Sequence, residues 1–277
     1  MRLPLAVFAA VALLAALPAL GQQAGPNVRN VRINAPQEGQ YGRMGMAVAA
    51  SADGQRIVAA WDDVQGTCGP PFNRPCPPPE PRGLTGVGVS TDGGRTWTAI
   101  SPDLTGGPSR DAYPFGTITT VAAGYDGRTV YVGTDDGRVW VTRDLGQTWT
   151  LLLSGRPWVT RITVSPADAG TAWVTISGYR SGSPLPHVLR TTDYGASWAD
   201  LSGNLPQAPV NDIVLGDGST LYVATDQSVF VSAAGDGQWQ RLGTGLPMVP
   251  VHDIEYDGGH HRLVAATFGR SMYELAT

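Results

Sequence analysis

The chain has 277 residues and a formal net charge of −4 at pH 7, with 36 glycines and 22 prolines. This length allows a substantial core and one or two domains, and the many glycines and prolines are typical of a chain with many tight turns. The acidic balance argues against nucleic acid as a partner, because nucleic-acid-binding surfaces are usually basic.

Residues 1–21 have the pattern of a secretion signal. Met1 and Arg2 give a short positive start, residues 3–20 are mainly apolar, and Ala19-Leu20-Gly21 fits the small-x-small cleavage rule. We therefore expect a mature chain that starts at Gln22 in a secreted or periplasmic location; a retained membrane anchor is the alternative. No later stretch is long and apolar enough to span a bilayer.

A strand-like segment precedes the first regular repeat, and a long insertion interrupts that repeat. Residues 28–35 alternate apolar and polar side chains, as a strand does, but have no partner strand nearby. A Pro-rich insertion at 62–84 carries Cys68 and Cys76, the two cysteines of the chain. In an exported protein, this close pair predicts a small disulfide loop. A metal site would need more ligands, and we expect no metal and no cofactor.

From residue 45 onward, short apolar runs alternate with turn residues. They form five groups of strands, at about 45–100, 117–153, 159–201, 210–242 and 251–277. The fifth group has three strands where the others have four, and residues 28–35 can supply the missing one. A sixth group hidden in 101–117 is the alternative, although that segment has no strand pattern.

One pattern, [S/T]-x-D-x-G-x-[T/S]-W, recurs in these groups. It occupies 90–97, 142–149 and 191–198, and a worn copy occupies 232–239. Successive tryptophans of the pattern are 52, 49 and 41 residues apart. A repeat of this length with several short strands per unit is typical of a propeller blade. We therefore predict an all-β fold: a single propeller within 22–277, with five four-stranded antiparallel blades and a ring closed by residues 28–35.

Each copy of the pattern has the chemistry of a hairpin turn. The aspartate can accept hydrogen bonds from backbone N–H groups just ahead of it, the glycine supplies a positive φ, and the tryptophan covers the hairpin with an apolar face. These structural positions are Asp92, Gly94, Trp97, Asp144, Gly146, Trp149, Asp193, Gly195 and Trp198. We expect them to stabilise the fold rather than bind a ligand.

This pattern resembles the Asp-box, or BNR repeat, of sialidases, sortilin-type receptors, xyloglucanases and photosystem assembly factors. The resemblance covers about residues 45–277. It implies a propeller whose box turns lie at the blade periphery, on the face away from the ligand. The segment 263–271 is also similar to the closing blade of bacterial secreted BNR proteins.

On that basis the binding face is formed by the loops between blades and the loops that join the second and third strands of a blade. These loops are rich in Arg, Asp and aromatic residues. The loops between blades offer Tyr41, Arg43, Arg110, Asp111, Tyr113, Arg156 and Trp158, and the loops within blades offer Asp62, Asp63, Tyr179, Arg180, His187, Asp226, Phe268 and Arg270. Long loops on a rigid ring are where propellers place binding sites. Our binding candidates are Arg43, Arg110, Asp111, Trp158, Arg161, Asp212, Asp253 and Arg270.

A second repeat marks the innermost strands. Residues 209–213 match 250–254, residues 159–162 align with both, and we expect Met46 and Thr120 at the corresponding places. The alignment puts Arg161, Asp212 and Asp253 on consecutive blades near the channel mouth. They form either a polar ligand site or an ion-pair network that satisfies charges in a wet channel.

The leading functional hypothesis is an exported, monomeric, non-catalytic module that binds a glycan or a protein. A sialidase-like glycoside hydrolase is one alternative, and an assembly or stability factor of an envelope complex is another. The sialidases that the chain resembles use three arginines, a Tyr activated by Glu, and an Asp. Here Tyr273 and Glu274 are neighbours whose side chains point to opposite faces of a strand, so no catalytic residue is assigned.

Overall fold

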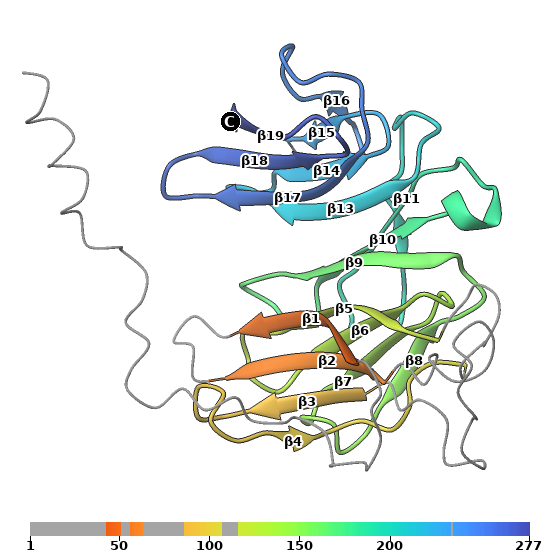
Figure 1. Ribbon diagram of the computed structural model, residues 1–277, viewed down its shortest axis with the longest axis vertical. Coiled ribbons are helices and arrows are strands. Elements are labelled where there is room, and N and C mark those ends of the chain that lie inside the picture. The colour runs from red at the N-terminus through yellow and green to blue at the C-terminus, as the bar shows by residue number, and fades with distance from the viewer. Residues whose placement is uncertain (1–42, 51–55, 64–85, 107–115, 234) are drawn as a thin grey trace, which may run out of the picture. The chain divides into compact units, whose positions relative to one another are not determined.

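The computed structural model describes residues 43–50, 56–63, 86–106, 116–233 and 235–277, which lie within one compact unit, Arg32–Thr277. These residues form five antiparallel sheets, as expected for five blades (Figure 1). Residues 28–35 and both cysteines lie outside the described residues, so ring closure and the disulfide stay predictions. The helical segment of the described part is a single 3₁₀ turn, η1 (Tyr179–Ser181).

Four sheets contain four strands and the last contains three, with sequential neighbours paired in each. The first sheet comprises β1 (Arg43–Ala50), β2 (Ile57–Asp63), β3 (Gly86–Ser90) and β4 (Thr98–Ala99). The second comprises β5 (Ile118–Ala123), β6 (Val130–Thr134), β7 (Val139–Thr142) and β8 (Thr150–Leu153). The third comprises β9 (Trp158–Val164), β10 (Ala172–Ser177), β11 (His187–Thr191) and β12 (Ala199–Asp200). The fourth comprises β13 (Val210–Leu215), β14 (Leu221–Thr225), β15 (Val229–Ser232) and β16 (Gln240–Arg241). The fifth comprises β17 (Val251–Asp257), β18 (Arg262–Thr267) and β19 (Met272–Ala276).

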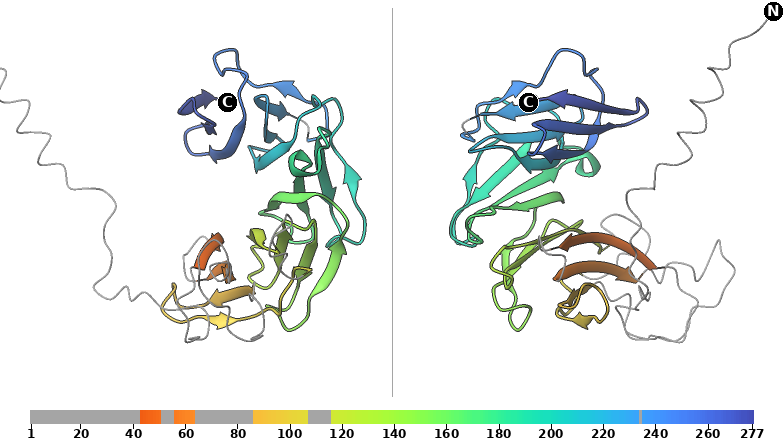
Figure 2. Two further views of the ribbon diagram at one scale, coloured as in Figure 1. Left: turned by 45° about the vertical axis from the view of Figure 1, so that its right-hand side comes forward. Right: turned by 90° about the vertical axis from the view of Figure 1, so that its left-hand side faces the viewer.

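The sheets follow one another in chain order, and the innermost strand of each contacts the innermost strand of the next (Figure 2). Strands in the middle of the stack are therefore covered on both faces. Every residue of β6, β10 and β14 is buried, and these strands are continuous apolar runs rather than alternating ones.

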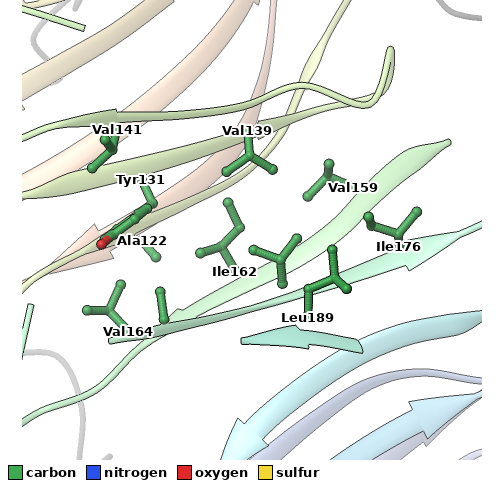
Figure 3. Packing of buried hydrophobic residues seen from close by; sticks show 11 residues of the cluster. Ala122, Tyr131, Val139, Val141, Val159, Ile162, Val164, Ile176 and Leu189 are labelled. Carbon is green, nitrogen blue, oxygen red and sulfur yellow. The ribbon is translucent and has the colours of Figure 1, made fainter. Parts of the chain in front are cut away.

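The hydrophobic core is divided among the spaces between consecutive sheets. Between the second and third sheets, Tyr131 and Val139 face Ile162, Ile176 and Leu189 (Figure 3). Similar clusters lie between the first and second sheets, the third and fourth, and the fourth and fifth. Each fully buried Val, Leu or Ile side chain contributes about 1.5–3 kcal/mol, so each sheet depends on its neighbours for stability.

The recurring turns join the third and fourth strands of the first four sheets, and the first three of them share one hydrogen-bond pattern. In the second sheet, Thr148 donates from its backbone N–H to Asp144 Oδ1 (2.9 Å) and from its hydroxyl to Oδ2 (2.7 Å). The Gly146 N–H donates to the Thr142 hydroxyl (2.7 Å). The copies at Asp92 and Asp193 have the same bonds. In the worn copy Gln238 replaces the hydroxyl residue, and its N–H donates to Asp236.

Glycine is required at the fifth position of these turns. Gly94, Gly146 and Gly195 have φ values of 85°, 86° and 86°, a region that L side chains rarely adopt. At Gly146 a Cβ atom would also lie 2.1 Å from the carbonyl oxygen of Ile100 in the preceding sheet. The turn thus combines a backbone conformation with a close approach between sheets.

The tryptophan of the turn connects neighbouring sheets. The indole N–H of Trp149 donates to the Ile100 carbonyl, and that of Trp239 donates to the Leu201 carbonyl, both at 2.8 Å. Trp97, in the first described sheet, donates within its own turn to Gly94. The indole N–H of Trp198 is buried and has no partner among the described residues.

Candidate functional site

A β-bulge recurs on the innermost strand of every sheet, close to the strand's beginning. The register skips one residue at Met46, Thr119, Thr160, Asn211 and His252. An extra residue in one strand re-aims side chains locally. The residue after each bulge is Ala47, Thr120, Arg161, Asp212 or Asp253. The expected equivalence of Thr120 with Arg161 is therefore confirmed, but that of Met46 is wrong by one residue, because Met46 is itself the bulged residue.

The bulged residues join neighbouring sheets by hydrogen bonds. The Thr119 hydroxyl donates to the Val159 carbonyl (2.5 Å), and the Thr160 hydroxyl donates to the Val210 carbonyl (2.9 Å). The Asn211 side-chain amide donates to the carbonyl of Val251 (2.9 Å). An innermost strand is a sheet edge with unpaired backbone groups. These side chains therefore satisfy edge carbonyls that face the neighbouring sheet.

The residues after the bulges form an ion-pair cluster across three sheets. Arg161 Nε lies 2.5 Å from Asp212 Oδ1, and Arg161 Nη2 lies 2.9 Å from Asp212 Oδ2 and 2.6 Å from Asp253 Oδ1. Asp212 is fully buried, and it also accepts the backbone N–H groups of Ile213 and Ile254. A buried carboxylate with a bidentate arginine and two backbone donors is fully satisfied. The cluster therefore has the character of a structural network.

The pKa shifts of Arg161 and Asp253, the two partly exposed members of the cluster, have different consequences for their charges. Hydrogen bonds to Asp212 raise the pKa of Arg161 further above its usual range, and partial burial opposes the shift. Partial burial of the Asp253 carboxylate, together with the charge of Asp212, raises the pKa of Asp253. Arg161 therefore keeps its positive charge. Of its two carboxylate partners, Asp253 is the one whose negative charge the site disfavours.

A cavity of about 530 Å³ opens beside this cluster, at the end of the sheets opposite the recurring turns. We call it the mouth cavity. Its lining comes from the starts of innermost strands and from the loops after the second strands: Thr119, Trp158, Thr160, Ser177, Tyr179, Arg180, Asn211, Asp226, Pro250, His252 and Phe268. Four lining residues are the bulged residues of the second to fifth sheets, so the bulge repeat positions the cavity floor.

Aromatic side chains form two walls of the mouth cavity. On the third sheet, Trp158 carries the Arg180 guanidinium 4.6 Å from its ring centroid, and Tyr179 is 74 % exposed. On the fifth sheet, Phe268 is 71 % exposed and lies against the ring of His252, with centroids 5.7 Å apart. Between the walls, Asn211 Nδ2 donates to Asp226 Oδ1 (2.9 Å) on the fourth sheet.

The structure separates the sequence-based binding candidates into different settings. Trp158 lines the mouth cavity, and Arg161, Asp212 and Asp253 form the ion-pair cluster. Arg270 is exposed in the turn before β19. Arg43 begins β1, and nothing further is described of its side chain. Arg110 and Asp111 lie outside the described residues.

Several cavity residues were not among those candidates. Tyr179, Arg180, Asp226 and Phe268 lie on the loops that the sequence assigns to the binding face, but nothing in their spacing selects them. Asn211 and His252 occupy the same place in the two matched inner-strand segments, which is the signal that could have identified them. Within the described residues, no group of three or more His, Cys, Asp or Glu side chains could hold a metal ion.

The expectation that Tyr273 and Glu274 do not act as a pair agrees with the register of β19. Tyr273 lies opposite Ala265 and Glu274 lies opposite Val264, so the two side chains project from opposite faces of the sheet. Glu274 forms an ion pair with Arg262 (3.1 Å). The described residues also contain no helix that is long and apolar enough to cross a membrane.

Comparison with solved structures identifies the architecture. One match is a chain in the crystal structure of the nidogen/laminin complex, with a TM-score of 0.51 and 14% identity over 84% of this chain and 80% of that chain. The fold is a β-propeller. YCF48 bound to D1 peptide matches with a TM-score of 0.50 and 13% identity over 88% of this chain and 70% of that one. The β-propeller domain of Myceliophteria thermophila Cps50 (Swd1) matches with a TM-score of 0.55 and 12% identity over 83% of this chain and 64% of that chain.

At these identities the propeller likeness concerns the fold alone. No protein-family model matches the sequence, and no curated protein matches it. The resemblance of the recurring turns to the Asp-box therefore stays an expectation from the turn sequences.

Proposed function

We propose that this propeller is a binding module that holds a segment of a protein partner in the mouth cavity. One observation carries the proposal: two large aromatic side chains, Tyr179 and Phe268, are more than two-thirds exposed on opposite sides of a concave site. Exposed aromatic side chains around a pocket are favoured anchors in interfaces, because they bury a large apolar area on binding.

The fold comparisons support an interaction role in general. The nidogen/laminin structure is a complex of two proteins, and YCF48 is bound to a peptide. The exposed rings of the mouth cavity give this chain a surface for the same kind of contact. A partner-binding role includes the hypothesis of an assembly factor for an envelope complex, and the signal-like residues 1–21 support a role after export.

A glycan is the second candidate ligand. The observation that favours it is the combination of exposed ring faces at Tyr179 and Phe268 with hydroxyl, amide and carboxylate groups on the cavity floor. Sugars present apolar C–H faces and many hydroxyls, so such a site can contact both. The peptide is preferred because the protons of Asn211, Thr119 and Thr160 on the floor already go to acceptors of the protein, which leaves few donors to orient a sugar.

A screen of the purified protein against a random peptide library and a glycan array tests both candidates. The matched variant is Tyr179→Ala with Phe268→Ala; both side chains are exposed, so little loss of stability is expected. We expect peptides to be enriched on the wild type and lost from the variant. Enrichment of glycans alone would favour the second candidate, and ligands that bind the variant equally well would overturn the proposed site.

A further inference from the structure

We infer that the mouth cavity recognises a cationic side chain, Lys or Arg, of the partner, with Asp226 as its counter-ion. The inference rests on the proposed function and goes further, because it specifies the chemistry of the bound group. It follows from which hydrogen-bonding groups on the cavity floor are already used.

The amide of Asn211 has no proton left for a ligand. Its Nδ2 carries two protons, and they go to Asp226 Oδ1 and to the Val251 carbonyl, each at 2.9 Å. Both partners only accept hydrogen bonds, so the orientation of the amide is fixed with its nitrogen toward them. The remaining group of this side chain is the Oδ1 atom, which is an acceptor.

The hydroxyl protons of the floor threonines are also used within the protein. A hydroxyl has one proton, and those of Thr119 and Thr160 have acceptors within the protein: the Val159 carbonyl for Thr119, and the Val210 carbonyl or the Thr175 hydroxyl for Thr160. Their oxygens keep lone pairs that can accept. The Ser177 hydroxyl accepts the backbone N–H of Tyr179 (3.3 Å).

Asp226 adds a negative charge to the hydrogen-bond acceptors of the floor. Its Oδ1 accepts from Asn211, and its Oδ2 has no hydrogen bond among the described residues. A ligand group that enters the floor must therefore donate hydrogen bonds, and a cation is favoured over a neutral donor because charge-assisted bonds are stronger. A ligand carboxylate would be repelled by Asp226, and on the floor it could accept only from the Ser177 hydroxyl, whose proton has no acceptor among the described residues.

The aromatic rings of the walls also attract a cation, whereas Arg180 opposes it. Aromatic faces carry negative charge density that attracts ammonium and guanidinium groups, and the wall at Trp158 already holds one such group, Arg180. Arg180 belongs to the exposed rim and repels a second cation. Its removal should therefore strengthen binding of the cationic group.

Four acetylated and amidated pentapeptides, Gly-Gly-X-Gly-Gly with X as Arg, Lys, Gln or Glu, test the inference by NMR titration of the full-length protein. We expect the Arg and Lys peptides to bind about tenfold more tightly than the Gln peptide, the usual scale for a hydrogen bond to a charged group. Asp226→Asn should remove that preference, and Arg180→Gln should strengthen binding of both cationic peptides. Asp217→Asn, in the turn at the opposite end of β14, is the matched control: its carboxylate bonds Tyr256 and His261 away from the cavity, so the change should leave peptide binding unaltered.

Either of two results overturns the inference: the Glu peptide binds as tightly as the Arg peptide, or Asp226→Asn leaves the preference for cations intact. Absence of binding by all four peptides also overturns it. If library peptides bind through Tyr179 and Phe268 without any preference for charge, the proposed function stands and the cationic group is wrong. Because Arg180→Gln predicts a gain, a folding defect cannot imitate it.

Discussion

At the scale of single residues, the aspartates of the recurring turns are the clearest case of sequence dictating geometry. Each accepts a backbone N–H and a hydroxyl from the residue four positions later. These bonds stabilise the ionised form, and those from Thr96 lower the pKa of Asp92 to about 2. The pKa values of Asp144 and Asp193 are lowered by the equivalent bonds from Thr148 and Ser197.

These shifts predict a loss of stability in acid. A carboxyl group whose pKa is lower in the folded chain binds more protons when unfolded, so the free energy of unfolding falls as the pH falls. The effect begins as the pH approaches the ordinary value of 3.8, and for Asp92 it ends only below the folded pKa of about 2. Denaturant unfolding at pH 5, 4, 3 and 2 measures it. We expect Asp92→Asn to show a shallower decline below pH 4 than the wild type; an identical decline would contradict the assignment.

At the scale of strands, the sequence predicts the limits of a strand better than its register with the partner strand. The apolar runs of the sequence predict strands at 118–123, 130–134, 139–142, 172–177 and 221–225, and β5, β6, β7, β10 and β14 have these limits, because the runs end at turn residues. The innermost strands β9, β13 and β17 begin two residues earlier than the starts expected from the sequence, which are 160, 212 and 253. A bulge is defined only by the partner strand, and in β9, β13 and β17 the sequence pattern misses the strand residues ahead of it, although the same bulge in β5 does not displace the predicted start.

The bulges have an energetic consequence in the ion-pair cluster. Asp212→Ala would leave Arg161 without its bidentate partner and two backbone N–H groups without an acceptor. Loss of one member of a fully buried pair costs about 3–5 kcal/mol, and because the Arg161 side chain is 40 % exposed and keeps Asp253, we expect a loss of about 3 kcal/mol. Asp253 is 61 % exposed and its pKa is raised, so Asp253→Ala should change the free energy of unfolding by less than about 1 kcal/mol.

Chemical denaturation of the two variants at pH 7 distinguishes the structural network from a ligand site. A large loss for Asp212→Ala with a small change for Asp253→Ala supports the network. If both variants unfold like the wild type, the cluster contributes little to stability, and that result would favour a ligand-binding role for Arg161, Asp212 and Asp253.

At the scale of the whole molecule, the repeat predicts the number of sheets, but it does not predict the mouth cavity. Trp158 and Phe268 are 110 residues apart, and they line one cavity because three consecutive sheets present their loops at the same end. The sequence assigns both residues to the binding face from strand order alone. Which of the many loop residues line the cavity depends on the spacing between sheets, and that spacing is set by core packing.

The same packing makes each sheet's stability depend on its neighbours. Val174 in β10 is fully buried between sheets, whereas Val264, in the corresponding second strand β18, is 37 % exposed. Val174→Ala removes two buried methyl groups and should cost about 2 kcal/mol, while Val264→Ala should cost less than about 1 kcal/mol. The two changes are chemically identical, so their difference isolates the burial between sheets.

Unfolding followed by both tryptophan fluorescence and circular dichroism measures this difference and tests cooperativity. Because every core cluster is shared by two sheets, we expect one transition whose midpoint shifts in Val174→Ala while its slope with denaturant stays the same. A second transition that Val174→Ala leaves unshifted would mean that some sheets unfold independently. In that case each core would stabilise its own pair of sheets, and the mouth cavity, which spans four sheets, would lose its walls before the chain unfolds.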